Sequence, residues 1–179
     1  KASKALAEIL KLEGVKFVSC FPPNALINAS AELGIRTILT RQERVAINMA
    51  DGYTRVSFQP GVALVAGGVG IENAFSGLSQ AFADLVPMLL FVDQTPRRRL
   101  GSRPVQDFDA SFTLHKVTKW VETINFAERV PELMRRAFTY LRSGRPSPVV
   151  LELPTDVADE EFRDEWFEYK PVKGWKSSG

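Results

Sequence analysis

Apolar residues are distributed along the chain in two patterns, unbroken short runs and a helical spacing. Short runs of apolar and β-branched residues, typical of strands buried in a parallel sheet, occupy residues 15–20, 37–39, 61–66, 87–92, 117–124 and 149–153. Apolar residues with the spacing of one helix face occupy residues 2–13, 25–33, 40–55, 70–82, 107–114 and 131–141. This alternation predicts an α/β fold with three layers, α/β/α, around a mostly parallel sheet of about six strands.

The start of the predicted third helix carries a candidate functional residue. Thr40 and Glu43 have the spacing of a capping box, in which the threonine caps the helix and the glutamate bonds back to the threonine amide. Glu43 also follows the short strand at 37–39, and open α/β sheets bind ligands at the carboxyl ends of their strands. The residues alone therefore leave open both a structural role for Glu43 in the cap and a catalytic role.

A glycine-rich turn joins the strand at 61–66 to the next helix and contains Gly68, Gly70 and Asn73. Free amides at such a turn attract anions, so a phosphate or dinucleotide site is one interpretation. Asn73 stands where the dinucleotide fingerprint requires its third glycine, and no acidic residue follows at the required strand end. The dinucleotide interpretation is therefore weak, and a tight turn between strand and helix is the structural alternative.

Composition and charge narrow the classes of function. The 179 residues are 45% hydrophobic and 25% charged with a net charge of +2, which is ordinary for a globular domain and indicates no nucleic-acid partner. No apolar run reaches membrane-spanning length, so no membrane partner is expected. One cysteine, Cys20, and one histidine, His115, cannot build a metal site, so we expect no metal ligands. The arginines at 97–99 are interpreted as a solvated loop face or a contact for an acidic ligand.

Several motifs follow one another in the order of a known enzyme family. Pro22 lies in the turn after the first strand, Glu43 starts the third helix, and Val69 replaces proline in a turn otherwise like Gly-Pro-Gly-x-x-Asn. Further matches are Gln94, Pro96, Gln106, Thr118, Lys119 and the segment 142–156. On these motifs, residues 5–157 resemble the N-terminal, pyrimidine-binding domain of thiamine-diphosphate enzymes of the acetolactate synthase and 2-oxo acid decarboxylase type.

The resemblance implies roles for the matched residues. Glu43 and Gln106 are expected to be catalytic: Glu43 would share a proton with ring nitrogen N1′ of the aminopyrimidine, and Gln106 would orient a carbonyl or water. The residues expected to bind thiamine diphosphate are Pro22, Glu43, Gly68, Gly70 and Asn73. The Mg²⁺ ion that accompanies this cofactor would be held by a domain absent from this chain. The departures from the family pattern are Pro23, Val69, Asp93 and Asp107.

The resemblance also predicts the domain organisation. Residues 1–157 would form the pyrimidine-binding domain, and residues 158–179 a linker or tail towards a missing middle domain. Because this tail has linker character, we expect a fragment of a longer enzyme rather than a separate subunit. The expected partners are a diphosphate-binding domain of the same or a neighbouring subunit, a 2-oxo acid substrate and a second copy in a homodimer or larger assembly. A cytoplasmic location is expected, although a targeting peptide trimmed ahead of Lys1 would leave no trace.

The predicted activity is acetolactate-synthase-like decarboxylation and carboligation of a 2-oxo acid. Some decarboxylases of the family carry adjacent histidines in this domain that protonate the decarboxylated carbon and release an aldehyde. This chain has only His115, outside the matched loop, and the neutral amide of Gln106 is a poor proton source. The alternatives are a 2-oxo acid or acyl-CoA decarboxylase that releases an aldehyde, and a catalytically silent binding or regulatory module with the same fold.

Overall fold

One parallel sheet forms the centre of the molecule. The computed structural model describes residues 1–173, and within them six strands lie in the order β2-β1-β3-β4-β6-β5. The strands are β1 (Phe17–Cys20), β2 (Arg36–Leu39), β3 (Val62–Val65), β4 (Leu89–Gln94), β5 (Trp120–Thr123) and β6 (Val149–Pro154). Every pair of neighbouring strands is parallel. The predicted α/β class and the parallel sheet of six strands are therefore confirmed.

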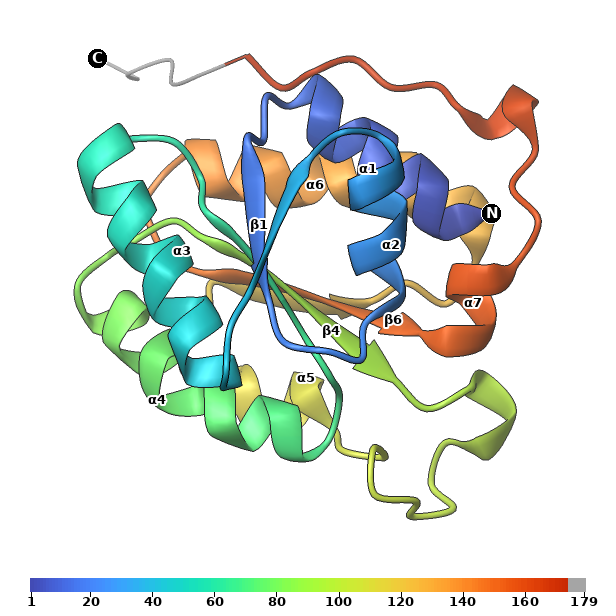
Figure 1. Ribbon diagram of the computed structural model, residues 1–179, viewed down its shortest axis with the longest axis horizontal. Coiled ribbons are helices and arrows are strands. Elements are labelled where there is room, and N and C mark those ends of the chain that lie inside the picture. The colour runs from blue at the N-terminus through green and yellow to red at the C-terminus, as the bar shows by residue number, and fades with distance from the viewer. Residues whose placement is uncertain (174–179) are drawn as a thin grey trace.

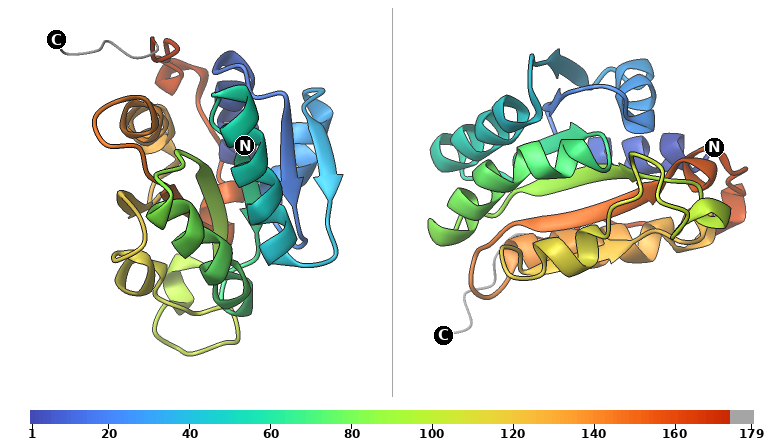
Figure 2. Two further views of the ribbon diagram at one scale, coloured as in Figure 1. Left: turned by 90° about the vertical axis from the view of Figure 1, so that its left-hand side faces the viewer. Right: turned by 90° about the horizontal axis from the view of Figure 1, so that it is seen from below.

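Helices cover both faces of this sheet (Figure 1, Figure 2). They are α1 (Ala2–Leu12), α2 (Ala25–Glu32), α3 (Glu43–Ser57), α4 (Val69–Ala83), α5 (Ala110–Leu114), α6 (Val130–Arg142) and α7 (Thr155–Asp159). Helices α1, α2 and α6 share an apolar core with one face, and α3, α4 and α5 share a second core with the other. This arrangement confirms the three layers. No helix within residues 1–173 is long and apolar enough to cross a membrane.

Strand β4 shows why the sequences of the central strands are apolar at nearly every position. Leu89 and Phe91 belong to the core beneath α1, α2 and α6, whereas Leu90 and Val92 belong to the core beneath α3, α4 and α5. All four side chains are fully buried. Successive side chains of a strand point to opposite faces, so a strand covered on both sides needs an apolar residue at nearly every position.

Helix α5 begins later than predicted. The expected start was Asp107, but the helix begins at Ala110, and the Asp109 carboxylate caps it by accepting a hydrogen bond of 2.8 Å from the Phe112 amide. The Asp107 carboxylate instead accepts a hydrogen bond of 2.9 Å from the Arg103 amide, four residues upstream. Asp107 therefore closes a turn that precedes the helix, which is why the predicted boundary was wrong.

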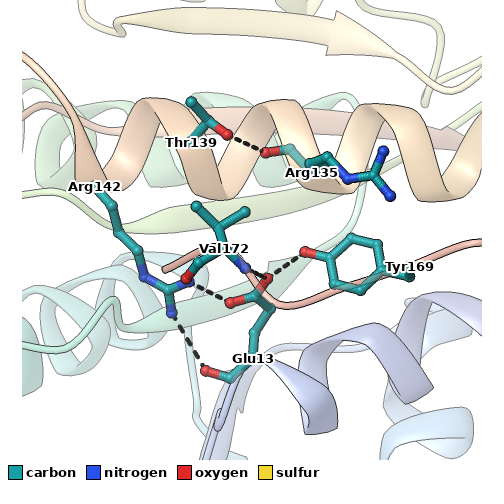
Figure 3. A network of polar contacts seen from close by, with 6 residues as sticks. All are labelled: Glu13, Arg135, Thr139, Arg142, Tyr169 and Val172. Atoms are coloured by element: carbon teal, nitrogen blue, oxygen red, sulfur yellow. Dashed lines mark hydrogen bonds and ion pairs between the residues drawn. The ribbon is translucent and has the colours of Figure 1, made fainter. Parts of the chain in front are cut away.

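The chain beyond α7 packs against the domain. Its aromatic residues that contact the core of α1, α2 and α6 are Phe162, Trp166, Phe167 and Tyr169. The buried carboxylate of Glu13 accepts hydrogen bonds from Arg142 and from the Tyr169 hydroxyl (Figure 3). It also accepts the Val172 amide at 2.9 Å. The domain boundary predicted at residues 157–158 falls inside α7, residues 174–179 lie outside the described part, and a following middle domain stays a prediction.

Candidate active site

The predicted capping box at the start of α3 does not form. The helix begins at Glu43, and Gln42 holds the N-cap position without a side-chain cap. Thr40 instead pairs with the neighbouring strand, because its amide donates to the Cys20 carbonyl at 2.9 Å; its hydroxyl lies 2.8 Å from the Gln42 carbonyl and 3.1 Å from that of Cys20. The prediction was wrong because the partner of Thr40 is β1, far away in sequence. The Glu43 carboxylate is thereby left without a capping role.

The Glu43 carboxylate faces helix α4. It accepts a hydrogen bond of 3.0 Å at Oε2 from Nδ2 of Asn73, and Glu43 is only 5% exposed. Within residues 1–173, no hydrogen bond reaches its other oxygen, Oε1. A buried carboxylate with one side-chain donor and one free oxygen is suited to exchange a proton with a bound group.

Gly70 lets this carboxylate lie against the start of α4. A Cβ at position 70 would lie 3.4 Å from Glu43 Oε1 and 3.3 Å from the Ala66 side chain. Both separations are tighter than most side-chain contacts, so an alanine would press on the carboxylate. The structure therefore brings three predicted residues together, namely Glu43, Gly70 and Asn73.

Gly68 serves a close approach of two backbones. It has a φ of +62°, and a Cβ there would lie 2.2 Å from the Val105 carbonyl oxygen and 2.8 Å from the Cα of Gln106. The backbone of the loop that carries Gln106 therefore lies in direct contact with the glycine turn. This contact explains the glycine without a phosphate ligand and places Gln106 at the same edge of the sheet as Glu43. No hydrogen bond joins the side chains of Gln106 and Glu43 among the described residues.

The turn after β1 carries Pro22 at that same edge. Pro22 is exposed, and the turn ends at Asn24, which caps α2 as predicted by accepting the Leu26 amide at 3.0 Å. The Asn24 amide group also donates to the Val65 carbonyl at 2.9 Å, which ties the turn to the end of β3. Asn24 therefore holds a turn in which the family resemblance led us to expect glycine.

A polar cavity of about 340 Å³ opens beside the Glu43–Asn73 pair. Its lining residues are Gln42, Arg44, Glu72, Asn73 and Ser76. They come from the N-cap and first turn of α3 and from the first half of α4, so the cavity lies between the amino-terminal halves of the two helices. Bound groups that enter here would find donors and acceptors next to a buried carboxylate.

Two further buried acids were missed by the sequence analysis. Burial raises the pKa of Asp93 to about 7, although the Ala25 amide bonded to its carboxylate acts in the opposite direction. Its Oδ1 has no hydrogen-bond partner within the described chain. Burial also raises the pKa of Glu152, against the effect of hydrogen bonds from Thr123 and Gln94. The available signal was an acidic residue inside or directly after an apolar strand run.

The remaining candidates lie apart from Glu43. Arg97 pairs with Asp156 at 2.8 Å and with Glu160 at 3.1 Å, so this arginine joins the start of its loop to the chain around α7. Arg98 and Arg99 are exposed, and His115 follows the last turn of α5. Within residues 1–173, no three acidic, histidine or cysteine side chains gather as a metal site would require.

Comparison with known proteins gives one family. Residues 1–114 match the family model described as "Thiamine pyrophosphate enzyme, N-terminal TPP binding domain". The chain is 35% identical over 165 residues to a "Probable acetolactate synthase large subunit" of Methanocaldococcus jannaschii, which covers 90% of the chain and 28% of that relative. It is 33% identical over 181 residues to "Acetolactate synthase 2, chloroplastic" of Nicotiana tabacum, covering 99% and 27% respectively. The chain thus spans less than a third of these relatives.

Proposed function

Because the chain belongs to the thiamine pyrophosphate enzyme family, in which it matches the N-terminal TPP binding domain, we propose that Glu43 binds the aminopyrimidine ring of thiamine diphosphate. The observation that carries this proposal is the placement of Glu43 itself. Glu43 is 5% exposed, its carboxylate takes no part in a helix cap and keeps one oxygen without a hydrogen-bond partner among the described residues, and its neighbours Gln42, Arg44 and Asn73 line a polar cavity. A ring nitrogen that shares a proton needs a partner of this kind within about 2.6–3.2 Å.

The neighbouring residues would hold and orient the ring. Asn73 fixes one oxygen of Glu43, so the other is directed to the ligand. Gly70 leaves room for a flat group next to the carboxylate, and Pro22 would cover the cofactor from the turn after β1. When bound, thiamine diphosphate supplies the carbon that attacks the carbonyl of a 2-oxo acid. The chain's part is to hold a proton at Glu43 and keep water away from it.

The activity proposed for the complete enzyme is acetolactate-synthase-like decarboxylation and carboligation. The similarity to acetolactate synthases supports this activity, as does the position of the single histidine, His115, after α5. Release of an aldehyde by the family's adjacent histidines would need a second histidine, and the single histidine of this chain is His115. The departures from the family pattern at Pro23, Val69 and Asp107 favour the alternative, a catalytically silent binding or regulatory module.

A partner surface next to the site is part of this proposal. Val45, Val69 and Phe75 are 43%, 52% and 38% exposed on the helices that carry Glu43 and Asn73. Apolar side chains of this size around a site are typical of a surface that another domain covers. We expect a diphosphate-binding domain with its Mg²⁺, from the same or a neighbouring subunit of a homodimer, to cover it. A cytoplasmic location stays a prediction.

Cofactor dependence of the complete enzyme tests this function. The enzyme stripped of cofactor should be inactive with pyruvate and should regain turnover when thiamine diphosphate and Mg²⁺ are added together. The expected product is acetolactate or another joined product. Acetaldehyde as the dominant product would overturn carboligation, and turnover that ignores thiamine diphosphate would overturn the proposal as a whole.

A further inference from the structure

The loop that carries Gln106 lacks regular structure of its own. Between the short helical turn at Arg97–Arg99 and the start of α5, it consists of turns and bends. Its contact with Gly68 brings backbone against backbone and supplies no hydrogen bond. Something else must fix the position of Gln106, and two buried polar side chains beneath the loop do so.

Gln94, the last residue of β4, holds the loop through its side-chain amide. Its Oε1 accepts the Thr95 amide at 2.7 Å, which fixes the orientation of the group. Its Nε2 then donates to the Phe108 carbonyl at 2.8 Å and to Glu152 Oε1 at 3.1 Å. Gln94 thus contacts the backbone two residues after Gln106, at Phe108.

Glu152 completes this attachment from the neighbouring strand β6. It is 3% exposed, and its carboxylate accepts the Thr123 hydroxyl at 2.6 Å in addition to Gln94. The backbone amide of Ala110, the first residue of α5, donates to the Phe108 carbonyl at 3.0 Å, the same oxygen that Gln94 contacts. Glu152 therefore ties down the end of the loop through Gln94, whose amide group contacts both Glu152 and the Phe108 carbonyl.

From this geometry we infer that Glu152 is a positioning residue, which acts through Gln94 to hold Gln106 against the glycine turn of the site. The inference rests on the proposed function only in taking Gln106 as a catalytic residue of the thiamine-diphosphate site, as the family resemblance implies. A charged side chain inside a buried strand is costly unless it is hydrogen-bonded, and here each oxygen of the carboxylate accepts one side-chain donor, from Gln94 and from Thr123. The site thus extends from β4 to β6, beyond the cofactor-binding residues.

Hydrogen exchange of the complete enzyme tests the positioning. Glu152→Ala should raise the exchange rate of the amides at 100–110 about tenfold, and Gln94→Ala should do the same without removing a buried charge. Glu152→Gln keeps an acceptor for Gln94, so its exchange rate should lie between those of the unmodified enzyme and Glu152→Ala. Glu122→Ala, one strand away with its side chain outside the attachment, is the matched control. If the exchange rates of Glu152→Ala and Gln94→Ala at residues 100–110 equal that of the Glu122→Ala control, the inference is overturned.

Turnover in a double-mutant cycle tests whether the effect passes through Gln106. Glu152→Ala should lower kcat about tenfold in the native background and should add nothing once Gln106 is replaced by alanine. An equal loss in both backgrounds would show that Glu152 acts elsewhere and would overturn the inference. Faster exchange together with normal turnover of Gln106→Ala alone would support the positioning and contradict the catalytic role proposed for Gln106.

Discussion

Asn73 on α4 donates a hydrogen bond of 3.0 Å to Glu43, the first residue of α3. The two residues come from helices that pack side by side on one face of the sheet. The bond occupies one carboxylate oxygen and takes the place of the cap that the local spacing predicted. It converts a residue that could have been structural into one with a defined orientation next to a cavity.

Removal of this donor should weaken the site without unfolding it. Asn73→Ala should lower turnover of the complete enzyme about tenfold, because the Glu43 carboxylate loses its orientation. Ser79→Ala, on the same helix and away from Glu43, is the control. Steady-state kinetics and thermal melting together decide the outcome, and a large drop in melting temperature with normal turnover would contradict this role.

Gly68 and Gly52 should respond to alanine in opposite directions. At Gly68 the φ of +62° and the contact with Val105 oppose a side chain, so Gly68→Ala should destabilise the chain by about 1–3 kcal/mol. At Gly52, inside α3, a Cβ would meet nothing within 4 Å, so Gly52→Ala should stabilise by about 0.5–1 kcal/mol. Urea denaturation measures both, and equal effects would contradict the close approach.

Asp93 should make stability fall as the pH rises. Burial raises its pKa from 3.8 to about 7, so the folded chain keeps a proton that the unfolded chain loses between about pH 4 and pH 7. Stability should therefore decline through this window by up to about 4 kcal/mol, at about 1.4 kcal/mol per pKa unit. Asp93→Asn should flatten the profile and be the more stable protein at pH 8.

The control for this profile is Asp164→Asn, a substitution of an exposed acid in the segment after α7. Denaturation midpoints between pH 4 and pH 8 are compared among the three proteins. A profile of Asp93→Asn that coincides with that of the unmodified chain would contradict the assigned shift.

The contact between Tyr169 and Glu13 predicts how firmly the terminal segment is held (Figure 3). Tyr169→Phe removes one donor to a buried carboxylate and should cost about 1.5–3 kcal/mol of unfolding free energy. It should also speed proteolysis between residues 160 and 173. Tyr140→Phe is the control, and identical cleavage rates for both variants would contradict the attachment.

Much of the fold was predictable because its signals are local. The run from Leu89 to Val92 predicts a strand buried on both faces, and Asn24 predicts the start of α2 from its own side chain. The start of α3 was not predictable in this way. Thr40 has the right spacing for a cap, but its amide bonds to the carbonyl of Cys20 at the end of β1. Which of the two partners Thr40 takes depends on how the strands assemble into the sheet.

The site was predictable to the extent that the resemblance extended. Glu43, Gly70 and Asn73 were expected from motifs and lie together. Glu152 lies in a strand expected to be apolar, and its hydrogen-bond partners come from β4 and β5. Such a network depends on which strands become neighbours, so no local pattern reveals it.

The substitution Glu43→Gln in the complete enzyme tests the central claim most directly. Glutamine keeps the size and the hydrogen bond to Asn73 but cannot share a proton, so turnover should fall by about 10²–10⁴. The melting temperature should stay close to that of the unmodified enzyme, and Glu32→Gln at the end of α2 should keep full activity. Near-normal turnover of Glu43→Gln, in a protein that is folded and loaded with thiamine diphosphate, would contradict the account.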